Sequence, residues 1–362
     1  MNCIGRKKNE IETPALCLAI DKVQRNLVSM AEFFKPLPSG LRPHFKTHKT
    51  PLLARMQVEA GAVGITCAKL GEAEVLGQAG IRDILIANQI VGADKIRRLV
   101  NLAAYTDVMV AVDEAENLRQ LAAAAQEKHV VLRVLIEYDV GMGRCGVRTP
   151  EAALTLTRLI AELPALRFEG IMGYEGHAVM IPDYAQRQEV VATAMRSLVG
   201  LRDHLQKQGF AVPIVSAGGT GSYTITGCFE GVTEIQAGSY LTMDAQYRDK
   251  VGIDEFECAL TMLTRVIHTH DRIAVVDAGL KCCTTEFGMP MVASCAGWRV
   301  SKLSEEHGFL EREGGEELKM GDTVELIPSH GCTTINLHDV YHVTRDNVVE
   351  AVWPIAARGR CT

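Results

Sequence analysis

Several features that mark other classes of protein are missing from this sequence. Its 38 lysines and arginines are outnumbered by 44 aspartates and glutamates, which gives a formal net charge of −6. Without a basic field, we expect neither a nucleic acid nor an anionic membrane as partner. No stretch approaches the roughly 20 consecutive apolar residues that a membrane-spanning helix needs. The basic start MNCIGRKKNE has no apolar run behind it, so a secretory signal peptide is not expected.

Disulfide bonds are not expected either. The 11 cysteines are an odd number and no secretory signal accompanies them, so we expect the reduced thiols of a cytoplasmic protein. With 362 residues, 47% of them hydrophobic, the chain can bury enough surface to fold without covalent cross-links. This composition is that of an ordinary globular protein and excludes a disordered or fibrous chain.

Up to about residue 250, short apolar runs alternate with longer amphipathic stretches. Continuous apolar runs are typical of buried parallel strands, and a helix must return each strand to the same edge. The expected strands are 40–46, 62–68, 83–89, 107–112, 130–139, 168–174, 212–219 and 233–240. About eight such units in roughly 200 residues are typical of a (β/α)8 barrel of the TIM type. Periodicity alone also permits a doubly wound open sheet.

The later part of the chain has strand-like runs, polar turns and little helical periodicity. It is expected to form a mostly antiparallel β domain, with a hairpin turn at 345–348. The run 15–20, which precedes the first expected helix, can add a strand to this domain. We therefore expect an α/β protein with a barrel at 21–248 and a β-rich domain formed by 1–20 and 249–362.

Reactive or glycine-rich segments follow five of the expected strands, which is where barrel enzymes carry their chemistry. These segments are 44–49, 137–146, 174–177, 216–222 and 236–240. The backbone N–H groups of the loop 218–222, with the hydroxyls of Thr220 and Ser222, can cradle a phosphate. The same glycines are equally compatible with a plain strand-to-helix turn.

Lys46 ends the first expected strand, between His44 and His48. Burying a lysine there is unfavourable unless its charge is paired with an anion, or unless it is neutral and takes part in the chemistry. A neutral lysine beside a phosphate cradle points to a Schiff base with pyridoxal 5′-phosphate (PLP). Arg144 is then the natural donor to the phenolate oxygen of that cofactor. The alternatives are a surface lysine, of which Lys49 is the plainest example, and a solvated arginine.

His330 and Cys332, two residues apart in the β-rich part, are candidate metal ligands. On an extended chain they would point to the same side, and both residue types bind zinc and similar ions. Two protein ligands are too few for a closed structural site, so a metal here would keep open positions for water or substrate. His307 can join this pocket or cap a loop, and the pair itself can be incidental. The neighbours Cys282 and Cys283 are expected to be structural.

Taken together, these segments resemble the D-threonine aldolase / D-serine dehydratase family, whose members are PLP enzymes with an alanine-racemase-like barrel. The resemblance spans nearly the whole chain through TPALCLAID, RPHFKTHK, DVGMGRCGV, GGTGS, TEIQAGSYLTMD, DAGLK, EEHG, PSHGC, NLHD and WPIAARG. It implies a lyase that uses PLP and a divalent metal (Zn, Mn or Mg) on a small D-amino acid. It also implies a homodimer.

The resemblance assigns roles to individual residues. It makes Lys46 the Schiff-base residue, and it adds Tyr174 and His177 as catalytic candidates. Gln236 stands where alanine racemases place an arginine towards the pyridine nitrogen, and a neutral partner there would weaken the ring as an electron sink. The cofactor-binding residues it implies are Lys46, Arg144, Tyr174, Gly218, Gly219, Thr220, Gln236 and Tyr240.

The type of lyase depends on the metal pair and the base. In this family His-x-Cys is usual in the D-serine dehydratases and His-x-Asp in the aldolases, so His330 and Cys332 favour a dehydratase. The sequence around PSH, NLHD and WPIAARG is more similar to that of the aldolases. A metal on the β-hydroxyl serves either reaction. The base can be His177, Glu175 or His307. We expect retro-aldol cleavage to glycine and an aldehyde, because the whole-chain likeness outweighs one ligand.

Three other functions stay open: a dehydratase, a racemase and a non-catalytic carrier of PLP. A D-serine or 3-hydroxy-D-aspartate dehydratase would release a 2-oxo acid and ammonia. A metal-free amino-acid racemase would use the same lysine, and the pair of His330 and Cys332 counts against it. A non-catalytic PLP carrier usually lacks a second domain, so the residues after 250 count against that alternative.

Overall fold

The computed structural model of the protein describes residues 3–362, so the first two residues of the basic start lie outside the described part. The chain forms two compact units. One, the barrel unit, comprises Met30–Lys46, Pro51–Gly238 and Arg360–Thr362. The other, the β unit, comprises the residues up to Ser29 together with Thr47–Thr50 and Ser239–Gly359. Helix α1 (Ile20–Phe34) is divided between the two.

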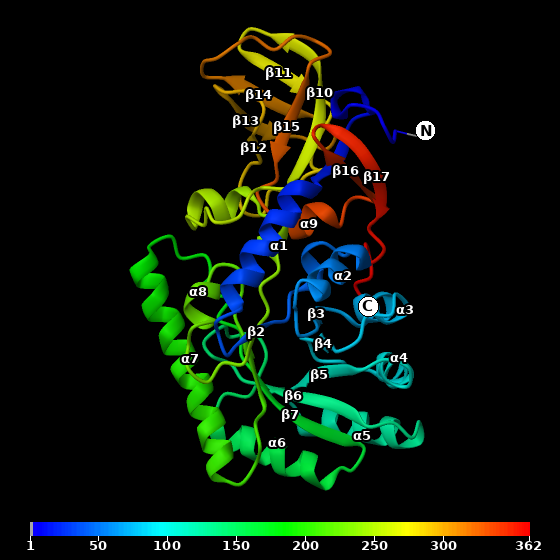
Figure 1. Cartoon of the computed structure of the whole chain (residues 1–362), viewed down its shortest axis with the longest axis vertical. Helices are drawn as coiled ribbons and strands as arrows, with labels where there is room; N and C mark the ends of the chain where they lie inside the picture. Colours follow the sequence, from blue (N-terminus) through cyan, green and yellow to red (C-terminus); the bar gives the residue numbers. More distant parts are fainter. Residues whose placement is uncertain (1–2) are drawn as a thin grey trace. The chain divides into compact units, whose positions relative to one another are not determined.

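An eight-stranded parallel sheet is the centre of the barrel unit (Figure 1). Its strands are β2 (Gly40–Leu41), β3 (Ile65–Cys67), β4 (Ile84–Ile86), β5 (Val108–Val112), β6 (Leu132–Glu137), β7 (Leu166–Met172), β8 (Ile214–Ala217) and β9 (Glu234–Ile235). They pair in the order β2-β9-β8-β7-β6-β5-β4-β3, and a parallel bridge between His44 and Thr66 joins the two ends. The sheet therefore curls into the predicted TIM-like barrel, and the open-sheet alternative is wrong.

The strands are buried and the helices are amphipathic, as barrel geometry requires. Every residue of β5 is buried, because helices cover the outer face and side chains fill the interior. Helix α4 buries Ile96 and Leu99 and exposes Lys95, which is the one-sided pattern of a surface helix. Figure 1 shows α3 to α7 outside the strands. The helices of this unit are α2 (Pro51–Glu59), α3 (Leu70–Gln78), α4 (Ala93–Ala103), α5 (Ala115–Glu127), α6 (Pro150–Glu162), α7 (Tyr184–Lys207) and α8 (Tyr223–Thr226).

A buried ion pair joins the first and last barrel strands. Arg42, directly after β2, is buried, and its Nε lies 2.9 Å from Oε2 of Glu234 in β9. Its Nη1 donates to the backbone carbonyl of Asp83 at 2.8 Å. A buried carboxylate without its cation is strongly unfavourable. This pair therefore contributes to closing the barrel.

Substituting Arg42 by methionine is expected to lower the free energy of unfolding by about 3–5 kcal/mol, because the Glu234 carboxylate then stays buried without a partner. Urea denaturation followed by circular dichroism measures the change. Arg97→Ala is the control: Arg97 pairs with Asp94 at the surface, and its removal should change stability by less than about 0.5 kcal/mol. Equal effects of the two substitutions would contradict the prediction.

The β unit is a nine-stranded sheet with antiparallel neighbours apart from one parallel pair, β1 with β16. Its strands are β1 (Ala15–Ala19), β10 (Leu260–His270), β11 (Ile273–Val276), β12 (Met291–Val292), β13 (Trp298–Leu303), β14 (Gly308–Arg312), β15 (Thr323–Ile327), β16 (Val340–Arg345) and β17 (Val348–Pro354). The mostly antiparallel domain and its N-terminal strand are thus confirmed. The hairpin is confirmed too: Asp346 and Asn347 have φ of 48° and 62°, as a type I′ turn requires.

Short helical segments complete the described chain. They are η1 (Lys8–Glu10), η2 (Phe45–Thr47), η3 (Ser239–Leu241), the π-helix η4 (Gln246–Lys250) and α9 (Gly331–Ile335).

The expectations on membrane spans and on cysteines concern the described residues as a whole. Within residues 3–362, no helix combines the length and apolarity needed to cross a bilayer. The cysteines, Cys282 and Cys283 included, are free thiols.

Candidate active site

Lys46 lies where barrel chemistry is expected, at the carboxyl end of the first strand. It belongs to η2, which follows β2, and its side chain is half-buried. Its backbone N–H donates to Nδ1 of the buried His44 at 3.4 Å. Lys49, expected as the exposed surface lysine, is instead buried, and its carbonyl accepts a hydrogen bond from the Ala357 N–H at 3.0 Å.

Arg144 and Tyr174, predicted to contact the cofactor, lie beside each other. The Arg144 guanidinium is 5.9 Å from the centre of the Tyr174 ring. It also pairs with Glu137, at 3.5 Å between Nη2 and Oε1. Glu137 is buried at the end of β6, and burial raises the pKa of its carboxyl group. Its other oxygen accepts a hydrogen bond from Nε2 of Gln89 at 2.6 Å.

The glycine loop after β8 packs against the same tyrosine. A Cβ on Gly219 would lie 3.3 Å from the Tyr174 ring, and a Cβ on Gly221 would collide with the carbonyl of Val179. Gly218 has a φ of +81°, which glycine adopts without strain. The loop thus brings bare backbone to the carboxyl edge of the barrel, as an anion cradle requires. We call Arg144, Tyr174 and Gly218–Ser222 the cofactor cluster.

Glu175, one of three candidate bases, is fully buried and hydrogen-bonded within the protein. It is 0% exposed, and its carboxylate accepts hydrogen bonds from Gly218 N–H at 3.1 Å, Ser222 Oγ at 2.7 Å and Thr226 Oγ1 at 2.5 Å. Its interpretation as a base is therefore wrong, because its oxygens are engaged and out of contact with solvent. The Ser222 hydroxyl donates its proton to Glu175, so it cannot donate the same proton to a phosphate. Glu175 instead anchors the glycine loop.

Glu175→Gln is expected to weaken PLP binding about tenfold, because an amide group replaces an acceptor that three donors share. Fluorescence titration of the apoenzyme with PLP measures the effect, and Glu151→Gln, at the exposed start of α6, is the control. If Glu175 were the base, turnover would fall while PLP affinity stayed unchanged.

The remaining predicted residues, the catalytic candidate His177 and the cofactor-binding candidates Gln236 and Tyr240, lie in different surroundings. His177 is exposed, and its ring packs on Gly141, 3.1 Å from where a Cβ would stand. Gln236 donates from Nε2 to Ser216 Oγ at 2.9 Å. Tyr240 is buried in the β unit, with its ring 5.6 Å from that of Phe256. His177 is thus the candidate base in the barrel unit that solvent reaches.

His330 and Cys332 form a pair, although not in the way their spacing predicts. His330 is extended and caps α9, whereas Cys332 is already helical, so the expectation of two ligands on one extended strand is wrong. The Cys332 thiol nevertheless lies close enough to the His330 ring to interact with it electrostatically. Burial on its own would lower the pKa of His330, but Cys332 and Asp244 raise it to about 10. Asp244 accepts at Oδ2 from Nδ1 of the ring at 2.8 Å.

This donor set fits an open metal site. A carboxylate on one ring nitrogen orients a histidine ligand and leaves the other nitrogen, Nε2, for the metal. An imidazole and a thiol together suit zinc and related ions. In the described part of the chain, no group of three or more His, Cys, Asp or Glu side chains is arranged to hold a metal. A cation here would therefore rest on His330 and Cys332 and complete its coordination with water or substrate.

His307 does not accompany this pair. It is exposed in the turn between β13 and β14, where its carbonyl accepts a hydrogen bond from the Ser304 N–H at 2.8 Å. The loop-capping alternative for His307 is therefore the one observed.

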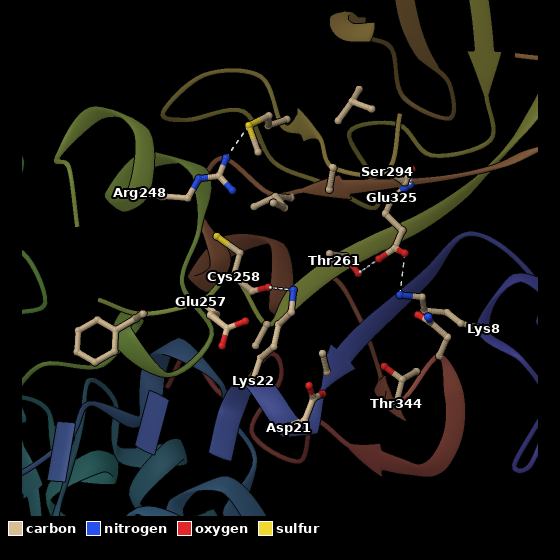
Figure 2. Close-up of a pocket in the computed structure, with 18 of the residues that line it drawn as sticks. Lys8, Asp21, Lys22, Arg248, Glu257, Cys258, Thr261, Ser294, Glu325 and Thr344 are labelled. Carbon is tan, nitrogen blue, oxygen red and sulfur yellow. Dashed lines mark hydrogen bonds and ion pairs between the residues drawn. The ribbon is translucent and has the colours of Figure 1, made fainter. Parts of the chain in front are cut away.

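A cavity of about 740 Å³ in the β unit contains none of the predicted site residues. Figure 2 shows that polar side chains lining it have partners within the protein. Lys8 pairs with Glu325, which also accepts a hydrogen bond from Thr261, and Lys22 donates to the backbone carbonyl of Cys258. A smaller cavity of about 320 Å³ is lined by Ser329 and Phe287 among others. The ring of Phe287 packs edge-on against His330, with 5.1 Å between the ring centres.

Three residues of the site were missed by sequence reasoning: Gln89, Glu137 as the partner of Arg144, and Asp244. Glu137 and Asp244 belong to segments that the sequence singled out, 137–146 and TEIQAGSYLTMD. Nothing in those segments shows which side chain each carboxylate contacts. Gln89 ends the third expected strand, and a polar residue at a strand end is only a weak indication of a site residue.

Two family models match the chain. The alanine racemase N-terminal domain matches residues 18–246, and a serine dehydratase domain matches residues 259–344. Among curated proteins, the 3-hydroxy-D-aspartate aldolase of Paracoccus denitrificans is 38% identical over 98% of this chain and 94% of its own length. The D-threonine aldolase of Arthrobacter sp. is 37% identical over 96% of this chain and 93% of its own length.

Solved structures agree with these sequence matches. The D-threonine aldolase from Filomicrobium marinum superposes with a TM-score of 0.96 at 35% identity, covering 99% of each chain. A D-threo-3-hydroxyaspartate dehydratase is more distant, with a TM-score of 0.88 at 26% identity over 96% of this chain and 98% of the other. That structure is a cysteine-to-alanine variant described as the metal-free form.

Proposed function

Since this chain belongs to the alanine racemase N-terminal domain family, and along its whole length to the D-3-hydroxy amino acid aldolases and dehydratases within it, we propose that it cleaves D-3-hydroxy amino acids to glycine and an aldehyde. It is a lyase, and its family uses PLP. The observation that carries the proposal is the cofactor cluster, which lies at the carboxyl edge of the barrel. Lys46 lies in η2, which follows the first strand of that barrel.

The residues of the barrel unit hold the cofactor. When bound, PLP supplies an electron sink for bond breaking at Cα. Lys46 would provide the amine for its aldehyde, and the backbone of the loop around Gly219 would receive the phosphate. Arg144 would donate to the ring oxygen, and the Tyr174 ring packs beside both the guanidinium and the loop. Gln236 is neutral, so at the position that the resemblance gives it, it would offer the pyridine nitrogen no charged partner.

The residues of the β unit hold the metal. His330 and Cys332 would hold a divalent cation, which would supply a Lewis acid for the β-hydroxyl of the substrate. Asp244 keeps Nδ1 of His330 engaged and so fixes the ring. His177 takes the hydroxyl proton, since it is the exposed imidazole in the barrel unit next to the cofactor cluster. In the family these groups act in a homodimer, and we propose the same here, in the cytoplasm.

Dehydration is the second candidate, and one observation favours it. The second proposed metal ligand is Cys332, whereas the aldolases of the family that the sequence resembles usually have an aspartate at this position. In that reaction Lys46 removes the α-proton and the β-hydroxyl leaves, giving a 2-oxo acid and ammonia. Whole-chain identity weighs the other way, since the aldolases match at 37–38% and the D-threo-3-hydroxyaspartate dehydratase of Delftia sp. at 29%.

Product analysis separates the two reactions. The holoenzyme, loaded with PLP and Mn²⁺ or Zn²⁺, is incubated with the D and L isomers of threonine and of 3-hydroxyaspartate. Glycine formed from the D isomers, in equal amount to the aldehyde, supports the proposal. A 2-oxo acid with ammonia would establish the dehydratase instead. Inversion at Cα that survives EDTA would establish a racemase.

A further inference from the structure

Glu137 is a buried carboxylate whose two oxygens contact different side chains. It is 4% exposed, at the last position of β6. Oε1 lies 3.5 Å from Nη2 of Arg144, and Oε2 accepts from Gln89 at 2.6 Å. Burying a charge this deeply is unfavourable unless it is paired and hydrogen-bonded. The guanidinium of Arg144 is the cation that the structure gives it.

The backbone that carries Arg144 is held without Glu137's side chain. Asp139 accepts at Oδ1 from the N–H groups of Gly141 and Gly143, at 3.1 and 3.0 Å. Asp113 accepts from the N–H of Gly146 at 2.8 Å. A Cβ on Gly146 would lie 2.8 Å from a backbone nitrogen of the same turn, so the loop folds tightly on the end of β6. Loss of the Glu137 charge should therefore leave the loop intact.

The side chain of Arg144, by contrast, needs a partner to fix it. It is 48% exposed and belongs to a long, flexible residue type, which loses rotamer entropy when it is held in one orientation. The Tyr174 ring, 5.9 Å from the guanidinium, limits it on one side only. A charge-assisted hydrogen bond from a buried carboxylate selects one direction among many.

We propose that Glu137 is a positioning residue for Arg144, and that Glu137 and Gln89 together aim the guanidinium at the ring oxygen of the cofactor. This inference rests on the proposed function, which makes Arg144 a cofactor-binding residue. Glu137 ends β6, and Gln89 and Tyr174 follow β4 and β7, so these groups come from three strand ends of one barrel edge. Glu137 and Tyr174 contact Arg144, and Gln89 supports Glu137. Glu137 itself touches neither cofactor nor substrate, and it acts through Arg144.

The principal test is Glu137→Gln, which keeps the size of the side chain and removes its charge. PLP affinity of the apoenzyme is expected to fall about tenfold, because Arg144 loses the charged acceptor that orients it. The visible absorbance band of the bound cofactor should also shift, because Arg144 no longer holds the ring oxygen. Glu169→Gln is the matched control: this half-buried carboxylate of β7 pairs with Arg133 away from the cofactor cluster. It should leave both readouts unchanged.

A double-mutant cycle tests whether Glu137 works through Arg144. In an Arg144→Ala background, adding Glu137→Gln is expected to change PLP affinity by less than about twofold, because the side chain it positions is gone. Independent, additive effects of the two substitutions would overturn the inference. So would an unaltered spectrum and affinity for Glu137→Gln in a wild-type background.

A third variant covers the case in which Glu137→Gln does not fold. Gln89→Ala leaves the carboxylate and its arginine in place and removes one support, so PLP affinity should fall about threefold. No change in this variant would count against the inference. Failure of the proposed function gives a different result: wild-type protein that neither binds PLP nor cleaves D-3-hydroxy amino acids.

Discussion

Lys46→Ala is expected to reduce turnover at least about a thousandfold, which is the largest effect that this account predicts. Alanine removes the amine that binds the cofactor aldehyde, and no hydrogen bond can replace a covalent link. The purified variant should also lack the visible absorbance of the wild-type holoenzyme. Turnover is measured as glycine released from D-threonine with PLP in excess.

Lys69→Ala is the matched control for this substitution. Lys69 follows β3 in the same way as Lys46 follows β2, but its side chain is exposed. We expect unchanged colour and turnover within about twofold, because an exposed lysine contributes little. A colourless, fully active Lys46→Ala enzyme would remove the basis of the proposed function.

His330→Ala is expected to cause the second largest loss: bound divalent metal should disappear and turnover should fall about a hundredfold or more. The reason is that the proposed cation would have two protein ligands, so the loss of one would leave Cys332 alone. Weakening a residue that merely supports a ligand already costs about 10–100-fold. Metal content of the purified protein and turnover after addition of Mn²⁺ or Zn²⁺ are the measurements.

Two further variants make this test specific. His307→Ala removes an exposed histidine of the same unit and should leave metal content unchanged. Asp244→Asn keeps both ligands but alters the acceptor of Nδ1, and metal affinity should fall about tenfold. Full metal content and full activity in His330→Ala would contradict the assignment of the pair.

The barrel could be predicted from the sequence because its strands are buried on both faces. Val108–Val112 is apolar throughout, and the segments between such runs repeat a helical period. Polar residues at the strand ends could be assigned to one edge for the same reason, since all parallel strands run in one direction. Lys46, Arg144, Tyr174 and the glycine loop could therefore be predicted from the sequence as candidate site residues.

The contacts among these residues could not be predicted, because they join positions far apart in the chain. Glu175 and His177 are two residues apart, yet one is fully buried and the other exposed. That difference arises from hydrogen bonds of Glu175 to Gly218, Ser222 and Thr226, which lie 43 to 51 positions later. No local pattern encodes such a partner.

The metal pair shows the limit of spacing arguments. Two residues separated by one lie on the same side only of an extended chain, and α9 begins at Gly331 between His330 and Cys332. The carboxylate that holds His330, Asp244, is 86 positions away and could not be recognised from the pair.

Peptide mapping after borohydride reduction tests the central claim most directly. Borohydride fixes a cofactor that a protein holds through a lysine C=N bond, so the labelled lysine can be found by mass spectrometry. We expect one pyridoxyl phosphate group per chain, on the peptide that contains Lys46. Label on another lysine, or none in an active enzyme, would contradict it.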